Sequence, residues 1–185
     1  MPHPNLLQQQ NAALIVVDIQ EGFRPIIADF DKIAERAARM IRGCRLLDVP
    51  VFVTEHYPKG LGNTAAEIKS LFDDIAGVFE KTAFSSCGAE SLVAGLTDKG
   101  IKQVMICGLE THICVNQTAH DLLDRGFQVH VLSDCVTSRF EYNRLAGLAK
   151  MQRSGAIESS IEMALFELMR DAKHEKFKEI QALIK

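Results

Sequence analysis

The chain has 185 residues, of which 47% are hydrophobic and 24% are charged, as in ordinary folded globular domains. Its formal net charge of −3, without a basic tail, argues against nucleic acid and anionic membranes as partners. No apolar run is long enough to cross a bilayer, and the polar residues 1–11 lack the apolar core of a signal peptide. We therefore expect a single cytoplasmic domain spanning residues 1–185.

The first half of the chain alternates apolar runs with amphipathic stretches. In order, it is expected to form a strand at residues 12–17, a helix at 31–47, a strand at 49–54, a loop at 55–64 and a helix at 65–72. The first strand is apolar at every position, which is typical of a strand buried on both faces of a parallel sheet. The loop contains Pro58, Gly60 and Gly62, a composition that suits the rim of a binding site.

The second half continues the alternation. The strands expected are at residues 77–84, 104–108, 127–132 and 156–159, and the helices at 87–99, 111–124, 139–153, 160–170 and 175–184. Six strands alternating with helices predict a three-layer α/β/α domain with a mainly parallel sheet in the order 3-2-1-4-5-6. Neither G-x-G-x-x-G after the first strand nor a P-loop occurs, so the phosphate-binding versions of this architecture are unsupported.

Five cysteines occur at irregular spacing, without a Cys-x-x-Cys pair. This pattern indicates neither a disulfide framework nor a zinc knuckle, so we expect reduced thiols. Cys44 and Cys107 are expected in the core. Cys114 differs, because Thr111 is a plausible N-cap that would place this thiol in the first turn of a helix. Backbone N–H groups and the helix dipole would there favour the nucleophilic thiolate, the alternative being an inert buried cysteine.

Three chemically matched side chains are predicted at the carboxyl ends of strands. Asp18 follows the first strand, Lys81 lies near the end of the third, and Cys114 follows the fourth. In the predicted strand order the first and fourth strands are neighbours, so Asp18 would face Cys114 across the crevice where such sheets bind ligands. A base beside a thiol is a nucleophile arrangement, and the lysine would balance its charge. The alternatives are a turn-capping Asp18 and a solvated Lys81.

At these residues the sequence resembles the isochorismatase-like cysteine hydrolases, which include nicotinamidases and isochorismatases, over almost the whole chain. The most specific segments are residues 14–20 (LIVVDIQ), 80–81 (EK), 107–119 (CGLETHICVNQTA) and 121–131 (DLLDRGFQVHV), with Asp134, Ser138 and Arg139. Residues 54–58 (TEHYP), 60–62 (GLG) and 177–180 (FKEI) are similar to the small, stand-alone isochorismatase domain-containing branch. The resemblance implies the isochorismatase-like hydrolase fold and a homo-oligomer, a dimer or larger.

The resemblance also implies a mechanism. Asp18, Lys81 and Cys114 would form a triad in which Asp18 takes the thiol proton and Cys114 attacks a carbonyl carbon, giving an acyl-thioester. A cis peptide at Leu109–Glu110 would direct backbone N–H groups of Glu110, Thr111 and Cys114 at the oxyanion. The substrate would be a small amide, ester or related compound. Vinyl-ether hydrolysis with Asp18 as general acid, or a non-catalytic oligomeric scaffold, are the alternatives.

The chain departs from nicotinamidases where these carry an Asp-x-His metal pair. Residues 54–58 contain no aspartate and a lone histidine, so we expect neither a metal nor another cofactor. Four side chains are candidates to line the substrate pocket: Gln20, Phe23, His56 and Tyr57. His112 is expected to point away from the site, Arg139 to be structural, and the role of Glu110 stays open.

Overall fold

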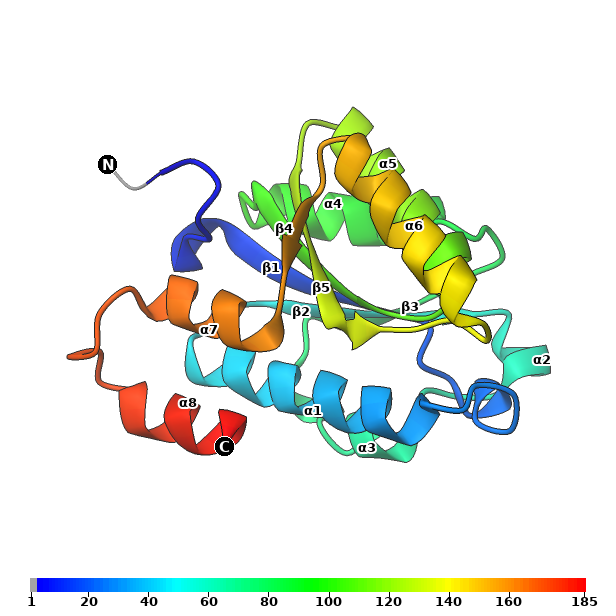
Figure 1. Ribbon diagram of the computed structural model, residues 1–185, viewed down its shortest axis with the longest axis horizontal. Helices are drawn as coiled ribbons and strands as arrows, with labels where there is room; N and C mark the ends of the chain where they lie inside the picture. Colours follow the sequence, from blue (N-terminus) through cyan, green and yellow to red (C-terminus); the bar gives the residue numbers. More distant parts are fainter. Residues whose placement is uncertain (1–2) are drawn as a thin grey trace.

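A computed structural model describes residues 3–185, apart from the side chain of Asp74. Its centre is a six-stranded sheet in the order β3-β2-β1-β4-β5-β6 in which every neighbouring pair is parallel (Figure 1). The strands are β1 Ala12–Val17, β2 Val51–His56, β3 Gly77–Lys81, β4 Gln103–Gly108, β5 Gln128–Val136 and β6 Ile157–Ser159. The predicted fold class and strand order are therefore confirmed.

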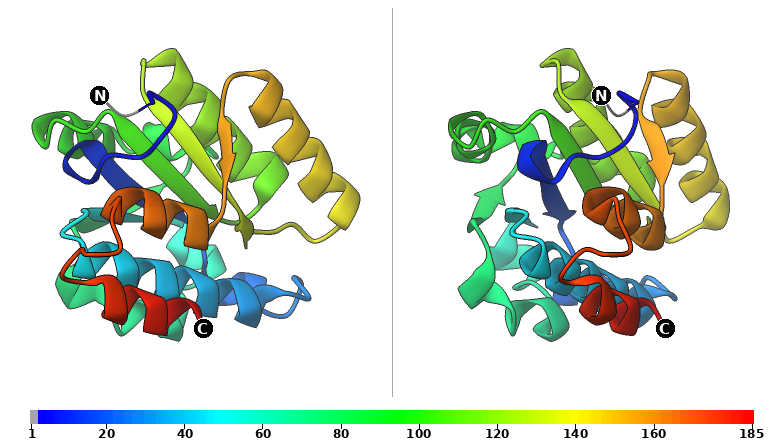
Figure 2. Two further views of the ribbon diagram at one scale, coloured as in Figure 1. Left: turned by 60° about the vertical axis from the view of Figure 1, so that its left-hand side comes forward. Right: turned by 90° about the vertical axis from the view of Figure 1, so that its left-hand side faces the viewer.

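The sheet separates two apolar clusters, and β1 shows how its sequence supplies both. Every residue of β1 is buried, and successive side chains point to opposite faces of the sheet. Ala12, Leu14 and Val16 belong to the cluster packed by α1, α7 and α8, while the alternate residues face α4, α5 and α6. Figure 2 shows these two helical layers on opposite sides of the sheet. A continuous apolar run is therefore what this position requires.

Seven helices follow the predicted order and differ from the prediction at their ends, whereas an eighth, short helix at Pro58–Leu61 lies within residues 55–64, which were expected to form a loop. They are α1 Phe30–Leu46, α2 Pro58–Leu61, α3 Ala66–Lys69, α4 Glu90–Asp98, α5 Asn116–Asp124, α6 Glu141–Arg153, α7 Ile161–Met169 and α8 Phe177–Ile184. Short 3₁₀ turns lie at Gln9–Asn11, Glu21–Phe23, Phe72–Asp74 and Ser86–Gly88, and one π-helical turn at Thr111–Val115. Within the described residues, no helix is long and apolar enough to cross a membrane.

Three predicted boundaries were wrong for physical reasons. The strand expected at 77–84 ends at Lys81, because the chain then turns so that the carbonyls of Ala83 and Phe84 accept hydrogen bonds from the lysine. The helix expected from residue 87 begins at Glu90, after a 3₁₀ turn capped by the Ser85 side chain. The strand expected at 127–132 extends to Val136 through an irregularity in its pairing with β4.

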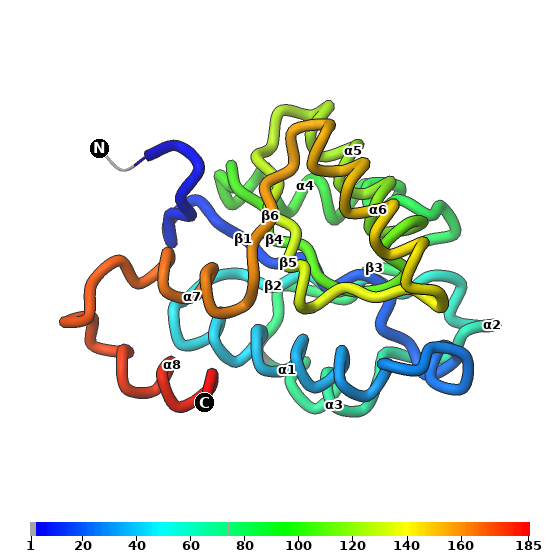
Figure 3. Tube along the Cα trace, viewed as in Figure 1, coloured from blue at the N-terminus to red at the C-terminus, as the bar shows by residue number. Residues whose placement is uncertain are grey.

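Because all six strands are parallel, their carboxyl ends share one edge of the sheet. The loops after β1 and β2 lie together at that edge, where the 3₁₀ turn Glu21–Phe23 contacts α2 (Figure 3). The Gln20 carboxamide connects them: it accepts from His56 N at 2.7 Å and donates to the carbonyls of His56 and Gly62. The residues that follow β1, β2, β3 and β4 are thus brought to one place.

Candidate active site

Asp18 lies at the carboxyl end of β1 in a left-handed backbone conformation, with φ of +50°. Its side chain is fully buried, and both carboxylate oxygens are bonded. Oδ1 accepts from the Thr54 hydroxyl at 2.7 Å, and Oδ2 accepts from Lys81 Nζ at 2.6 Å. Non-glycine residues with positive φ are uncommon and concentrate at functional sites, so this backbone supports a role for Asp18 beyond capping a turn.

Lys81, the last residue of β3, reaches across β2 to Asp18. Both side chains of this ion pair are 0% exposed. The lysine also donates to the carbonyls of Phe84 at 2.9 Å and Ala83 at 3.2 Å, which occupies all three donors of an ammonium group. A buried charge is tolerated when it is paired and hydrogen-bonded in this way. Lys81 is therefore a fixed positive charge beside the carboxylate, and not a solvated surface lysine.

Cys114 lies in the π-helical turn Thr111–Val115, which follows β4. It is almost fully buried, and Val17 of β1 is paired with Gly108 of β4, so the two segments leave the sheet side by side. The pKa of the Cys114 thiol is raised to about 12: burial contributes most, the charge of Asp18 and a hydrogen bond to it also raise the pKa, and Lys81 lowers it. The structure thus brings together Asp18, Lys81 and Cys114.

The expectation that Cys114 rests as a thiolate was wrong. Loss of hydration and the adjacent carboxylate outweigh the lysine, so the resting group is a thiol. The predicted N-cap was also wrong: Thr111 is already inside the helical turn, and its buried hydroxyl has no hydrogen-bond partner among the described residues. Thr111 N–H donates to the carbonyl of Thr137 at 2.9 Å, so it cannot contribute to the predicted oxyanion hole.

The turn before Cys114 also differs from the expectation. No peptide bond is cis among the described residues, so Leu109–Glu110 is trans. The chain turns instead at Gly108, whose φ is +127°, and a Cβ there would come within 2.1 Å of the Val17 carbonyl oxygen. Glu110 N–H has no acceptor in the part of the chain that the structure describes, whereas the Thr111 amide is occupied. Glu110 and Cys114 remain as proposed oxyanion donors.

Glu110, whose role the sequence left open, anchors this turn. Its buried carboxylate accepts from both the backbone N–H and Nε of Arg139, at 3.0 and 3.1 Å. Arg139 therefore has a structural contact, as expected. The His112 imidazole lies 3.0 Å from the Ser138 hydroxyl, so its ring is engaged with the segment after β5. Both contacts hold the Thr111–Val115 turn against residues 137–139.

The four candidate pocket residues fall into two groups. Gln20 is fully buried with its carboxamide occupied by backbone groups, and Phe23 packs against the core. His56 stacks on Phe84 with ring centroids 5.5 Å apart, and its buried Nδ1 has no hydrogen-bond partner in the part of the chain that the structure describes. Tyr57 is 54% exposed and lines a cavity of about 430 Å³ together with the backbone region around Lys81. His56 and Tyr57 thus lie beside the lysine, and Gln20 acts as a brace.

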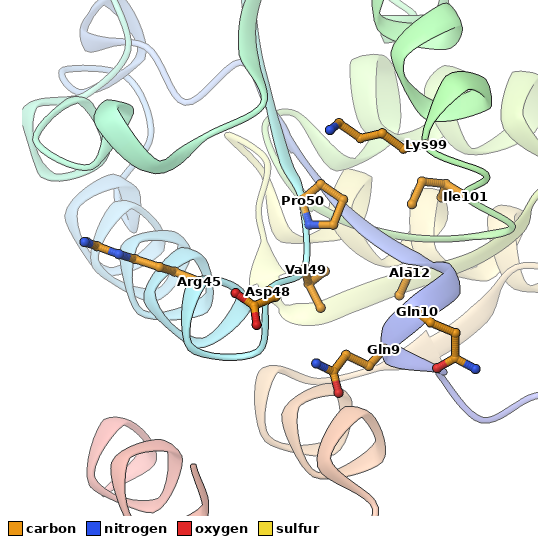
Figure 4. Close-up of a pocket in the computed structure, with 9 residues that line it drawn as sticks. All are labelled: Gln9, Gln10, Ala12, Arg45, Asp48, Val49, Pro50, Lys99 and Ile101. Carbon is orange, nitrogen blue, oxygen red and sulfur yellow. The ribbon is translucent and has the colours of Figure 1, made fainter. Parts of the chain in front are cut away.

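A larger cavity, of about 500 Å³, lies at the opposite edge of the sheet. It surrounds the start of β1 and the segment leading into β2 (Figure 4). Its lining residues are Gln9, Gln10, Ala12, Arg45, Asp48, Val49, Pro50, Lys99 and Ile101. None of the three chemically matched residues lines it. We therefore place the candidate active site at the carboxyl edge, where the buried ion pair and the thiol lie.

The residues at this edge do not fit a resident metal ion. No group of three or more His, Cys, Asp or Glu side chains that could hold a metal occurs among the described residues. The carboxylate nearest to His56 in sequence, Glu55, accepts from Thr64 N–H and from the Thr64 hydroxyl, both at 2.6 Å. This carboxylate closes the loop after β2 through its Oε1 atom.

Sequence reasoning missed Thr54 and Ser86. Thr54 Oγ1 touches Asp18 and lies 3.4 Å from Ser86 Oγ, and both residues are fully buried. The sequence feature that could have identified Thr54 is its position: it ends the apolar run of β2, and β2 was expected to lie beside β1. Buried hydroxyls are common enough in cores that the pattern did not single these residues out.

The fold and this edge define a three-layer α/β/α domain with a buried cysteine in the turn that follows its fourth strand. The family model described as isochorismatase domain matches residues 12–163, and the chain belongs to the isochorismatase family. It is 45% identical over 177 residues to mouse isochorismatase domain-containing protein 2A, covering 95% of this chain and 84% of that protein.

Two solved structures are also similar. One is titled MAR1 ribonuclease from Caenorhabditis elegans, with 39% identity, a TM-score of 0.88, and coverage of 97% of this chain and 92% of that one. The other, the YcaC product of Escherichia coli, is described as an octameric hydrolase of unknown specificity. It has 23% identity and a TM-score of 0.90, covers 100% of this chain and 91% of that one, and therefore supports the fold alone.

Proposed function

We propose that the chain is a metal-independent cysteine hydrolase that acts on a small amide, ester or related compound. The observation that carries the proposal is the buried Asp18 carboxylate, paired with Lys81 at 2.6 Å and adjacent to the Cys114 thiol. A thiol needs a base to become a nucleophile, and Asp18 is the adjacent acceptor. Lys81 stabilises the negative charge that the carboxylate and the sulfur share during proton transfer.

The reaction runs in two steps. Asp18 accepts the proton of Cys114 as Sγ attacks the carbonyl carbon, and the carbonyl oxygen becomes an oxyanion facing the backbone N–H groups of Glu110 and Cys114. The oxyanion collapses, the bond to the amine or alcohol breaks, and the leaving group takes the proton from Asp18. Water, giving a proton to Asp18, then attacks the thioester, and the acid leaves as Cys114 regains its proton.

The raised pKa of Cys114 is consistent with this order of reaction steps. A thiol whose pKa lies near 12 is protonated at neutral pH, so transfer to Asp18 accompanies the attack instead of preceding it. A desolvated thiolate formed during attack is a strong nucleophile, because it has lost its hydration shell.

The test uses p-nitrophenyl acetate as an activated ester. The wild-type chain is expected to release a stoichiometric burst of p-nitrophenolate and to carry one acetyl group on Cys114, located by mass spectrometry. Cys114→Ala should abolish the burst, and Asp18→Asn should slow it by about 100-fold or more. A Cys114→Ala chain that hydrolyses the ester as fast as wild type would disprove the acyl-enzyme mechanism. A substrate whose turnover needs Asp18 but not Cys114 would favour vinyl-ether hydrolysis.

The nematode relative is named a ribonuclease, which makes RNA a second substrate to test. The net charge of −3 counts against an RNA-binding surface. To test for RNA hydrolysis, the wild-type, Cys114→Ala and Asp18→Asn chains are each incubated with a labelled single-stranded RNA. We expect the wild-type chain to cleave this RNA no faster than either variant.

We also propose a homo-oligomer in the cytoplasm. The octameric YcaC structure has the same fold, and Phe140, Tyr142 and Leu145 are each more than half exposed near the start of α6. Five free cysteines suit a reducing compartment. Size-exclusion chromatography with light scattering is expected to give a dimer or larger, and a monomer at micromolar concentration would contradict the proposal.

A further inference from the structure

We propose that Thr54 is a positioning residue of this site: its hydroxyl sets the plane of the Asp18 carboxylate that receives the Cys114 proton. This inference rests on the proposed cysteine-hydrolase function. Thr54 touches neither the thiol nor the substrate in that mechanism, and acts through Asp18 alone.

Thr54 binds Asp18 through both its backbone and its side chain. Thr54 is paired with Val17 in the β1–β2 register, and its carbonyl accepts from Asp18 N–H at 3.2 Å. Its hydroxyl donates to Asp18 Oδ1 at 2.7 Å, and the residue is 0% exposed. A charged acceptor makes such a hydrogen bond stronger than a neutral one, and burial removes competing water.

Two anchors are needed to orient this carboxylate. The torsion that rotates a carboxylate plane is broad, so one contact leaves it free to turn. Lys81 holds Oδ2, and Thr54 holds Oδ1, so together they fix the rotation. The left-handed backbone of Asp18 places the residue outside both β1 and the following 3₁₀ turn, so regular structure does not restrict it further.

Thr54 also connects the base to the helix that follows the nucleophile. Its single hydroxyl proton goes to Asp18, so Ser86 Oγ, 3.4 Å away, is the donor in their contact. Ser86 N–H in turn donates to the hydroxyl of Thr118, at 2.8 Å. Thr118 lies on α5, four residues after Cys114. The contacts Thr54–Ser86, through two hydroxyls, and Ser86–Thr118, through the Ser86 backbone N–H, therefore tie the position of Asp18 to that of the thiol.

The experiment measures acetylation of the full chain by p-nitrophenyl acetate under single-turnover conditions. Thr54→Val keeps the side-chain shape and removes the hydroxyl. We expect its maximal acetylation rate constant to fall by about 10- to 100-fold, with the half-saturating ester concentration changed less than about twofold, because base alignment and not binding is impaired. Thr54→Ser restores the hydroxyl and is expected within about threefold of wild type.

Thr64→Val is the matched control. Thr64 is also buried and its hydroxyl also donates to a carboxylate, Glu55, at 2.6 Å. Removing the Thr64 hydroxyl breaks a comparable hydrogen bond that does not involve Asp18. The acetylation rate constant of Thr64→Val should therefore stay within about twofold of the wild-type value. Ser86→Ala serves as the second test variant should Thr54→Val not fold, and is expected to slow acetylation by about 3- to 10-fold.

A Thr54→Val chain that is folded and acetylates at the wild-type rate overturns the positioning role, as does a Ser86→Ala chain at the wild-type rate if Thr54→Val does not fold. In either case, Asp18→Asn and Cys114→Ala controls that remain inactive leave the proposed hydrolase mechanism in place. If those two controls acetylate as fast as wild type, the proposed function itself is wrong. Equal losses in the Thr54→Val and Thr64→Val chains would reduce Thr54 to a stabilising contact and overturn the inference.

Discussion

Replacing Lys81 with methionine tests whether the central ion pair holds the site together. The substitution keeps an unbranched side chain that is one heavy atom shorter and removes its charge, which leaves the fully buried Asp18 without its counter-ion. Two carbonyls, those of Ala83 and Phe84, also lose their donor. Removing one member of a buried ion pair typically costs about 3–5 kcal/mol, because the other charge stays desolvated and unpaired. This is a large share of the stability of most domains, about 5–15 kcal/mol.

The assay is urea unfolding followed by far-ultraviolet circular dichroism, since the chain has no tryptophan. The free energy of unfolding of Lys81→Met should be lower than that of wild type by about 3–5 kcal/mol. The double variant Asp18→Asn/Lys81→Met should recover several kcal/mol of that loss, because neither position of the pair then carries a buried charge. Lys59→Met, at an exposed position, is the control and should change stability by less than about 0.5 kcal/mol. A loss below about 1 kcal/mol at Lys81, or no recovery in the double variant, would refute the buried pair.

Three further predictions concern the thiol, a buried histidine and the catalytic turn. Because the pKa of Cys114 is raised to about 12, its alkylation by iodoacetamide should rise about tenfold per pH unit from pH 7 to 10 without a plateau; a plateau below pH 9, read by peptide mass spectrometry, would contradict this. Burial lowers the pKa of His130 to about 4, so between about pH 6.5 and 4 only the unfolded chain binds the proton. Stability should therefore fall by about 3 kcal/mol as pH drops through this window, and His130→Leu should flatten that part of a urea-unfolding pH series. Gly108→Ala should cost at least about 3 kcal/mol more than Gly155→Ala in thermal unfolding, because both need positive φ but only Gly108 meets a backbone oxygen within 3 Å; equal losses would mean that backbone strain alone matters.

The sheet was predictable because its signals are local and strong. The apolar run at residues 12–17 reports burial on both faces, and alternation with helices leaves few topologies open. The placement of Asp18, Lys81 and Cys114 at one edge was predictable for the same reason, since each lies at or after the carboxyl end of a recognisable strand and parallel strands end at one edge. The family resemblance added which of the many strand-end residues to choose.

What could not be predicted depends on contacts made across the fold. The hydroxyl of Thr54 contacts Asp18 because β2 lies beside β1, and it contacts Ser86 because another loop places Ser86 next to it. The raised pKa of Cys114 depends on how completely the site excludes water, which a helix-terminus argument ignores. The amide of Thr111 was assigned to the oxyanion, but Thr137 accepts from it after β5 runs four residues beyond its expected end.

Lys81 lies on β3, and the position of β3 in the sheet affects how the proposed activity is lost in denaturant. β3 is an edge strand that pairs only with β2, and its residues before Lys81 are half-buried or exposed. Edge strands with few buried contacts open at a lower free energy than the centre of a sheet. Opening β3 withdraws the lysine while β1 and β4 stay paired. In the proposed mechanism, the active state is therefore a subset of the folded state, and mild denaturant should abolish the proposed esterase activity before circular dichroism reports any unfolding.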